Sequence, residues 1–301
     1  MRVFVTGATG FVGPFLCAHL AACGDEVTAA DIGLDITDPT GVAAALTDAR
    51  PEIVYHLAAQ ADVAASWRDP EATLRVNAIG TQHVLDGARA AGVGRVLVIG
   101  SAEEYGKVDP AAGRVGEDTP LRPISPYGAS KVAAGAIALQ AWLGHGLETV
   151  RVRPFNHTGP GQTPAFFIPG FARRIAEAER SGAPVITAGS LDAVRDLSDV
   201  RDVVRAYRLL AIGGEPGSVY NVCSGTGTAI SELAERLLRL ARVSLRIETD
   251  PALVRPAEVP VLVGDPTRLH DATGYEPQYE TDATLAAVLE DARAAVAAQG
   301  S

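Results

Sequence analysis

The sequence predicts an α/β protein with a doubly wound parallel sheet and a smaller, discontinuous second lobe. In the first half of the chain, short runs of Val, Ile and Leu alternate with segments of helical character. Strands that helices cover on both faces have such near-continuous apolar sequences. A glycine-rich turn follows the first run directly, as at the first strand-to-helix connection of a doubly wound fold. A hydrophobic fraction of 47% over 301 residues is enough for a large core.

The elements follow one another in a regular order. Strands are expected over residues 2–6, 26–30, 52–57, 95–99, 148–152 and 219–222, and helices over 11–22, 39–47, 71–91, 125–143 and 231–241. Residues 154–184 break this rhythm, since they are rich in Gly and Pro at first and then helical over 169–180. The tail, 243–301, is expected to hold a short strand and two helices. The predicted domains are therefore 1–160 with 185–242, which carry the sheet, and 161–184 with 243–301, which form the second lobe.

Composition and charge exclude several classes of protein. The formal net charge of −10 argues against a surface for nucleic acid or anionic membranes, because such surfaces gather Lys and Arg. Three cysteines without a CxxC pair predict neither a disulfide framework nor a zinc site, so no metal is expected. The chain begins in a strand, which predicts no signal peptide, and it has no run of about 18 apolar residues that could span a membrane. A cytoplasmic location is expected.

Glycines recur at every third position after the first strand, in the motif TGATGFVG. Gly7 permits the tight turn, Gly10 lets the backbone approach a pyrophosphate, and Gly13 lets the following helix pack closely on the sheet. The amino end of a helix favours anions through its free N–H groups and its dipole. Phe11 and Val12 open that helix and are therefore included among the residues expected to bind a dinucleotide cofactor.

Asp31 ends the second strand, about two dozen residues after the first glycine. A carboxylate at this position accepts hydrogen bonds from the adenosine ribose and repels a 2′-phosphate. NAD(H) is therefore the favoured cofactor, with NADP(H) as the alternative. Asp35 and Ile36 would then lie along the adenine.

Tyr127 and Lys131 stand four residues apart on an expected helix and so share one face. A free tyrosine has a pKa of about 10, which a neighbouring ammonium lowers. Tyr127 can then exchange a proton with a hydroxyl or keto oxygen during hydride transfer, while Lys131 holds the nicotinamide ribose. Ser101 follows the fourth strand, where side chains face the ligand crevice, and can donate a hydrogen bond to the same oxygen.

These motifs together resemble the extended short-chain dehydrogenase/reductase family of nucleotide-sugar epimerases, dehydratases and reductases. The resemblance covers nearly the whole chain and implies a Rossmann fold, a nucleotide-sugar substrate and a catalytic set of Ser101, Tyr127 and Lys131. It also implies a homodimer built on the helices over 71–91 and 125–143. To the cofactor-binding residues it adds Leu57, Ala58, Ala59, Asn77 and Pro154, with Tyr127 and Lys131.

Four further stretches of sequence indicate one branch of this family. They are RPFNHTGPGQ at 153–162, AGSLDAVRD at 188–196, DVRDV at 199–203 and RPAEVP at 255–260. They resemble the GDP-mannose branch, which holds 4,6-dehydratases and reductases of 4-keto-6-deoxy sugars. This implies that Arg195 and Arg255 bind the diphosphate and its ribose, since a planar guanidinium suits phosphate. Glu258 would accept ribose hydroxyls, and Asn156 would contact the sugar.

Ala102 distinguishes between a 4,6-dehydratase and a reductase. A 4,6-dehydratase needs a base for the C5 proton and an acid for the leaving hydroxyl. The dehydratases of the family carry a hydroxyl or carboxyl residue and then a glutamate after the catalytic Ser or Thr. Here Ala102 can donate no proton, and only Glu103 remains as a catalytic candidate. The expected reaction is therefore reduction of a GDP-4-keto-6-deoxy-sugar at C4, which gives a GDP-6-deoxyhexose such as GDP-D-rhamnose.

Two alternatives remain open from the sequence. A 4,6-dehydratase or a 4-epimerase of the same family would share most of these motifs, and an epimerase would retain bound NAD through purification. A non-catalytic protein that senses the cofactor is expected to lack the tyrosine or the lysine. Both Tyr127 and Lys131 are present, which counts against it.

Overall fold

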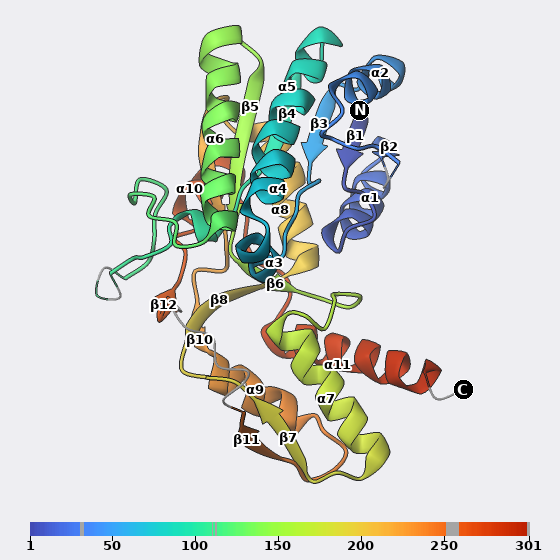
Figure 1. Cartoon of the computed structure of the whole chain (residues 1–301), viewed down its shortest axis with the longest axis vertical. Coiled ribbons are helices and arrows are strands. Elements are labelled where there is room, and N and C mark those ends of the chain that lie inside the picture. The colour runs from blue at the N-terminus through green and yellow to red at the C-terminus, as the bar shows by residue number, and fades with distance from the viewer. Residues whose placement is uncertain (31–32, 110, 112, 251–258, 300–301) are drawn as a thin grey trace.

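A six-stranded parallel sheet forms the centre of the protein in a computed structural model that describes residues 1–30, 33–109, 111, 113–250 and 259–299. The strand order is β2-β1-β3-β4-β5-β9, and every neighbouring pair is parallel (Figure 1). The strands are β1 (Arg2–Thr6), β2 (Glu26–Ala30), β3 (Ile53–His56), β4 (Arg95–Ile99), β5 (Glu148–Pro154) and β9 (Val219–Val222). The predicted doubly wound fold is confirmed.

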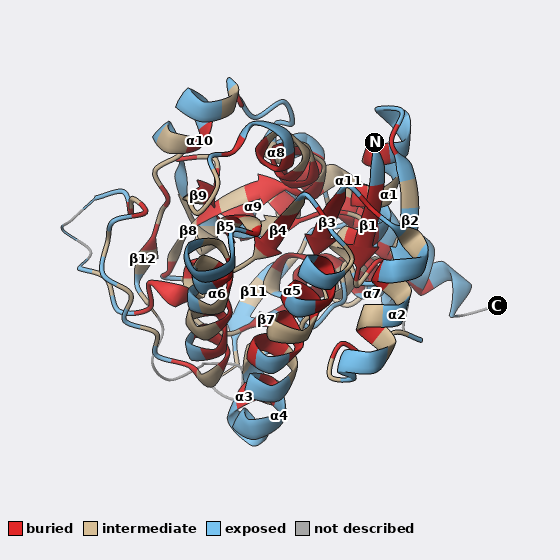
Figure 2. Ribbon diagram, turned by 90° about the horizontal axis from the view of Figure 1, so that it is seen from above, coloured by how far each residue is buried: buried red, intermediate tan, exposed pale blue. Residues whose placement is uncertain are grey.

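Helices cover both faces of this sheet. One face packs on α1 (Val12–Ala22), α8 (Val200–Gly213) and α10 (Thr267–Thr273), and the other on α2 (Pro39–Ala49), α5 (Gly80–Ala90) and α6 (Pro126–His145). Within β1, Val3 and Val5 enter the first core and Phe4 the second, because successive side chains of a strand point to opposite faces. Figure 2 shows the buried strands in red between these helices. Helix α8 was not predicted, since residues 199–203 were interpreted only as a motif.

The long helix predicted over 71–91 consists of three segments. It begins as α4 (Pro70–Leu74), continues as a π-helical segment η1 (Arg75–Ile79) and ends as α5. The short helix α3 (Val63–Arg68) precedes it, and a 3₁₀ turn η2 (Ala102–Glu104) follows β4. Single π-helical turns inside α-helices occur frequently at functional sites.

The second lobe has a core of its own. It contains α7 (Phe167–Ser181), α9 (Ile230–Arg239), α11 (Thr281–Ala298) and the strand pair β7 (Val185–Ala188) and β11 (Arg246–Thr249). The predicted boundaries differ from this packing, since they assign β7 and α9 to the sheet domain and α10 to the second lobe. The physical reason is that α9 buries Leu233 and Leu237 against α7 and α11, whereas Leu269 of α10 packs against the central sheet.

A small sheet lies between the two halves. Strand β8 (Val194–Asp199) pairs with β10 (Gly227–Ala229), β12 (Val261–Leu262) and β6 (Asn156–Thr158) (Figure 1). The described part of the tail thus contributes the strands β11 and β12, where one strand was expected. Among the described residues, no helix is both long and apolar enough to cross a membrane.

Candidate active site

The glycine turn between β1 and α1 leaves no room for a side chain at Gly7 or Gly13 and borders open space at Gly10. Gly7 has φ +68°, and a Cβ on it would lie 2.7 Å from the Ala58 backbone nitrogen. A Cβ on Gly13 would overlap the carbonyl of Ala8. A Cβ on Gly10 would meet only the Gly7 oxygen, at 3.3 Å, and would otherwise point into open space. This side-chain-free turn at a helix amino end fits the pyrophosphate of a dinucleotide.

Phe11 and Val12 pack their side chains away from that open space. The Phe11 ring stacks on His157 with ring centroids 6.1 Å apart, which ties α1 to β6. Val12 packs against the core beneath α1 and α8. These packing contacts fix the backbone of the two residues at the start of α1.

The segment after β3 runs beside the glycine turn. The Ala58 N–H donates to the Thr6 hydroxyl at 3.1 Å, and the Leu57 N–H donates to the Thr6 carbonyl at 3.3 Å. Ala59 follows and is half-buried. Pro154 ends β5 beside Val222, at the same carboxyl edge of the sheet. The predicted cofactor residues Leu57–Ala59 and Pro154 thus meet at one edge with the turn.

Asn77 lies in the π-helical segment and is buried. Its side-chain oxygen accepts from the Gln60 N–H at 2.8 Å, and its side-chain nitrogen donates to the Gln60 carbonyl and the Ser130 hydroxyl. Ser130 in turn donates to the carbonyl of Tyr127 at 2.7 Å. Asn77 therefore fixes the loop after β3 against helix α6, and both of its side-chain N–H groups have protein partners.

The predicted adenine-side residues are described only in part. Asp31 lies outside the described residues. Asp35 is exposed, and its carboxylate accepts from the N–H and the hydroxyl of Thr37, both at 2.8 Å, which lowers its pKa. Ile36 is buried in the core, and a Cβ on Gly80 would touch its side chain. Its contact with adenine therefore stays a prediction that its buried side chain does not support.

Ser101, Tyr127 and Lys131 lie together at the carboxyl end of β4. Ser125 caps the amino end of α6 and so places Tyr127 in the first turn of that helix. The Ser101 side chain lies near the Tyr127 hydroxyl, where its hydrogen-bonding effect lowers the pKa of the tyrosine. The Lys131 Nζ donates to the carbonyl of Ile99 at 2.9 Å and lies 5.9 Å from the centroid of the Tyr127 ring. The tyrosine, serine and lysine thus form one constellation, as predicted.

Burial controls the charges of this constellation. It raises the pKa of Tyr127 to about 12, against the opposing effect of the Ser101 hydrogen bond. It lowers the pKa of Lys131 to about 8, while the negative charge of Glu104 acts in the opposite direction. The expectation that Lys131 lowers the pKa of Tyr127 is not met in this structure, because burial dominates and the ammonium bonds to Ile99. Near neutral pH, Tyr127 is a neutral group that can donate a proton.

Glu103 faces Arg195 across the junction with the small sheet. Burial raises the pKa of Glu103, and the Arg195 charge opposes that rise. The Arg195 guanidinium also donates to the carbonyl of Val194 at 2.9 Å. Ala102 is buried in a small apolar cluster with Phe155 and Tyr105, so no proton donor stands between Ser101 and Glu103.

The predicted substrate residues are only partly brought together. Arg195 lies on β8, and Asn156 is exposed at the start of β6, paired with Leu197 of the same strand β8. Arg255 and Glu258 fall outside the described residues. Over the described part of the chain, no group of three or more His, Cys, Asp or Glu side chains could hold a metal ion.

Sequence reasoning missed several polar residues around this site. Arg153 and Glu104 form a buried ion pair at 2.8 Å, and His56 bridges the hydroxyls of Thr6 and Thr81. The available signal was the pair of arginines, Arg151 and Arg153, in an interior strand of the sheet, since a buried charge requires a partner.

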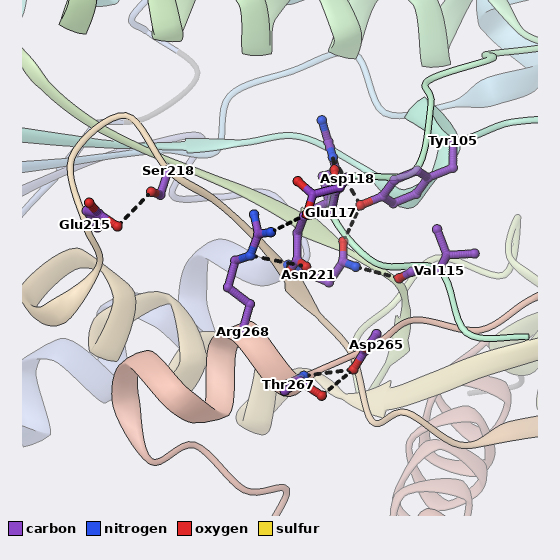
Figure 3. A network of polar contacts seen from close by, with 11 residues as sticks. Tyr105, Val115, Glu117, Asp118, Glu215, Ser218, Asn221, Asp265, Thr267 and Arg268 are labelled. Atoms are coloured by element: carbon purple, nitrogen blue, oxygen red, sulfur yellow. Dashed lines mark hydrogen bonds and ion pairs between the residues drawn. The ribbon is translucent and has the colours of Figure 1, made fainter.

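An open polar groove of about 600 Å³ lies next to Glu117, whose carbonyl accepts from Arg153. It is lined by Gly116, Glu117, Asp118, Thr119, Asp265, Thr267, Arg268 and Asp271. Figure 3 shows Arg268 paired with Glu117 and Asp118 and, in the same polar network, the hydrogen bond between Tyr105 and Asn221.

Known proteins resemble the chain over nearly all of its length. Residues 3–223 match the NAD dependent epimerase/dehydratase family. The GDP-6-deoxy-D-mannose reductase of Pseudomonas aeruginosa is 40% identical over 294 residues, which are 96% of each chain. The structure of RMD from Pseudomonas aeruginosa complexed with NADPH matches with a TM-score of 0.91 and 39% identity, over 98% of this chain and 99% of that one. The UDP-glucose 4-epimerase of Thermus thermophilus in complex with NAD matches with a TM-score of 0.87 and 30% identity, over 98% of this chain and 100% of that one.

Proposed function

Because the chain belongs to the NAD-dependent epimerase/dehydratase family, we propose that it is a reductase of a nucleotide-activated 4-keto-6-deoxy-sugar. The observation that carries this proposal is the sequence Ser101-Ala102-Glu103 at the carboxyl end of β4, next to a protonated Tyr127. A reductase needs one proton donor at the carbonyl oxygen, and Tyr127 provides it. The likeness to a GDP-6-deoxy-D-mannose reductase over 96% of both chains supports the same function.

In the proposed reaction, the bound NAD(P)H would supply a hydride to C4 of the sugar. Tyr127 donates its proton to the oxygen at C4, so that the carbonyl becomes a hydroxyl, and water later returns a proton to the tyrosine. Ser101 donates a hydrogen bond that orients the carbonyl. Lys131 holds a positive charge beside the developing oxyanion, in a buried site where that charge is weakly screened.

The proposed substrate is a GDP-sugar. Arg195 and Arg255 would bind the diphosphate and its ribose, Glu258 would accept ribose hydroxyls, and Asn156 would contact the hexose. The product would be a GDP-6-deoxyhexose such as GDP-D-rhamnose. Asp31 favours NADH as the reductant, while the NADPH complex of the similar Pseudomonas aeruginosa protein supports NADPH as the alternative.

A 4,6-dehydratase is the second candidate, because Glu103 is half-buried with a raised pKa, as an acid that protonates a leaving hydroxyl requires. With Ala102 beside it, that glutamate would have to serve the elimination alone. This makes the dehydratase the less favoured activity.

We further propose that the enzyme is a cytoplasmic homodimer. An alanine-rich stripe runs along the outer face of α6, through Ala129, Ala133 and Ala136. These residues share one face because they are spaced at three or four positions, and small side chains permit close helix packing. Cell fractionation with an antibody against the chain tests the location.

The first test follows the NADH absorbance band with enzyme, NADH or NADPH, and GDP-4-keto-6-deoxy-D-mannose. A fall in absorbance that Tyr127→Phe abolishes supports the reductase, and analysis of the product then gives its configuration at C4. Conversion of GDP-mannose itself to a keto sugar, without net use of cofactor, would instead identify a dehydratase.

A further inference from the structure

A buried ion pair next to the catalytic constellation takes no part in the reaction proposed above. Glu104 and Arg153 are joined at 2.8 Å, and their side chains are 3% and 7% exposed. Desolvating two charges costs several kcal/mol per ion. A hydrophobic pair could fill such a position at no such cost, so the two charges at this place indicate a role beyond packing.

One carboxylate oxygen of Glu104 holds the backbone of the catalytic serine. The Ser101 N–H donates to Oε1 at 3.0 Å, and the other oxygen, Oε2, accepts from Arg153 Nε at 2.8 Å. The Glu103 N–H donates to the Ser101 hydroxyl at 3.1 Å, which completes a reciprocal capping arrangement. Gly100 leaves room for this carboxylate, because a Cβ there would overlap Oε1.

Arg153 is itself fixed from three sides. Its Nη1 donates to the hydroxyl of Tyr105 and to the carbonyl of Glu117, both at 3.1 Å, and its guanidinium lies over the Tyr105 ring. The Tyr105 hydroxyl donates to Asn221, whose N–H donates to the Glu117 carboxylate (Figure 3). These contacts hold the Arg153 guanidinium in place, and the ion pair with Arg153 in turn orients the Glu104 carboxylate.

The same carboxylate lies against the helix that carries the catalytic lysine, since a Cβ on Gly135, one turn after Lys131, would lie 4.0 Å from Glu104 Oε2. The Ile99 carbonyl that accepts from Lys131 also lies only two residues before Ser101, whose N–H donates to Glu104. The groups that face Lys131 are Glu104 from η2, His56 from β3 and Tyr127 from its own helix, and Glu103 acts in turn on Tyr127. His56 is neutral, since burial and the lysine charge lower its pKa to about 3. Tyr127 is also neutral near pH 7. Glu104 therefore provides the negative charge that favours the ammonium form of Lys131.

We propose that Glu104 is a positioning residue: Arg153 orients its carboxylate, one oxygen holds the Ser101 backbone, and its charge keeps Lys131 as an ammonium. The part of this proposal that concerns turnover rests on the proposed reductase function. The part that concerns the charge of Lys131 does not, and it can be measured without any substrate.

The composition of the chain allows a direct measurement. The sequence contains only two lysines, Lys107 and Lys131, among 26 basic residues. NMR of protein labelled with ¹³C at the lysine Cε carbons should therefore give two titrating signals, and the exposed Lys107 serves as an internal reference. Glu104→Gln should lower the titration midpoint of Lys131 by about half a pH unit or more, because a nearby opposite charge is removed.

A matched control uses another buried carboxylate. Asp25 has a side chain that is also 3% exposed and pairs with Arg208 at 2.8 Å, yet Lys131 is not among its partners. Asp25→Asn should leave the midpoint of Lys131 unchanged. Because Glu104→Gln leaves Arg153 without its partner, the double variant Glu104→Gln/Arg153→Gln is measured as well, and it should show the same downward shift.

Turnover tests the positioning of Ser101. Glu104→Ala removes the acceptor for the Ser101 N–H, whereas Glu104→Gln retains an acceptor there. We expect kcat to fall about ten- to a hundredfold in Glu104→Ala with little change in KM, and Gln to restore part of it. An unchanged Lys131 midpoint in both Gln variants, or equal kcat in the Ala and Gln variants, overturns the proposal. Absence of reductase activity in the unaltered protein overturns the proposed function and leaves the NMR result standing.

Discussion

Tyr127 and Lys131 both have pKa values shifted by burial, and the two shifts have opposite consequences. The raised pKa of Tyr127, about 12, keeps the phenol protonated at every pH at which the enzyme would work. The lowered pKa of Lys131, about 8, brings loss of its charge within the accessible range. The hydroxyl is therefore always ready to donate, and the ammonium is the group that titrates.

Tyr127→Phe should remove the proton donor and leave the fold intact, since it deletes one hydroxyl and keeps the buried ring. We expect kcat to fall by roughly 10²- to 10⁴-fold, the usual contribution of a positioned acid or base. The dissociation constant of NADPH, measured by its fluorescence, should change by no more than a factor of about three. That factor corresponds to a change of less than about 1 kcal/mol in the free energy of binding. Retained turnover would mean that another group protonates the oxygen.

The pH profile should report Lys131. Its pKa lies below the ordinary value of 10.5, so the ammonium is present below about pH 8 and is lost as the pH rises through that value. We expect kcat/KM to decrease above about pH 8 as Lys131 loses its charge. No second decrease caused by ionisation of Tyr127 is expected below about pH 11. The measurement is a set of initial rates in a constant-ionic-strength buffer. A profile that stays flat to pH 10 would contradict the assignment.

At the scale of elements, the turn between β1 and α1 combines two requirements in one motif. Gly13 is needed for packing, because a Cβ there would overlap the Ala8 carbonyl. Gly10 is needed for access, because a Cβ there would meet only one protein atom within 4 Å, the Gly7 oxygen at 3.3 Å. The two glycines should therefore respond differently to the same substitution.

Gly10→Ala should leave the thermal midpoint nearly unchanged and weaken NAD(P)H binding at least tenfold, since its methyl group projects where the pyrophosphate would approach. Gly13→Ala should lower the free energy of unfolding by about 1–3 kcal/mol, because overpacking forces the helix off the sheet. Calorimetry and cofactor fluorescence on both variants separate the effects. Equal losses of stability in the two variants would refute this division.

At the scale of the whole molecule, the proposed active site joins two sheets. The catalytic side chains come from the central sheet and α6, while Arg195 and Asn156 come from the small sheet around β8. The electrostatic contact of Glu103 with Arg195 crosses this junction. In the proposed site, substrate binding and catalysis would therefore depend on how the two sheets are held together.

The outer face of α6 should form the dimer interface. Ala136→Arg places a long charged side chain on the exposed alanine stripe, so we expect the dimer to dissociate into monomers in light scattering coupled to size exclusion. Ala283→Arg, on an exposed position of α11, is the matched control and should leave the dimer intact. A monomer in the unaltered protein would refute the proposed dimer.

The sequence by itself determined the features that local patterns encode. Apolar runs located all six strands of the central sheet, and the glycine spacing located the turn after β1. The spacing of Tyr127 and Lys131 placed both on one face of a helix. Each of these features depends on backbone geometry over a few residues, and the local sequence pattern determines that geometry.

Only the tertiary structure decided the partners of residues that lie far apart in the chain. Glu104 meets Arg153 across 49 positions, and the side chain of Ile36 packs into the core. Helix α9 has the pattern of any amphipathic helix, and only the surfaces of α7 and α11 decide that it packs in the second lobe. The physical reason is that periodicity fixes which face of an element is apolar, whereas the fold fixes what that face, or a buried charge, will contact.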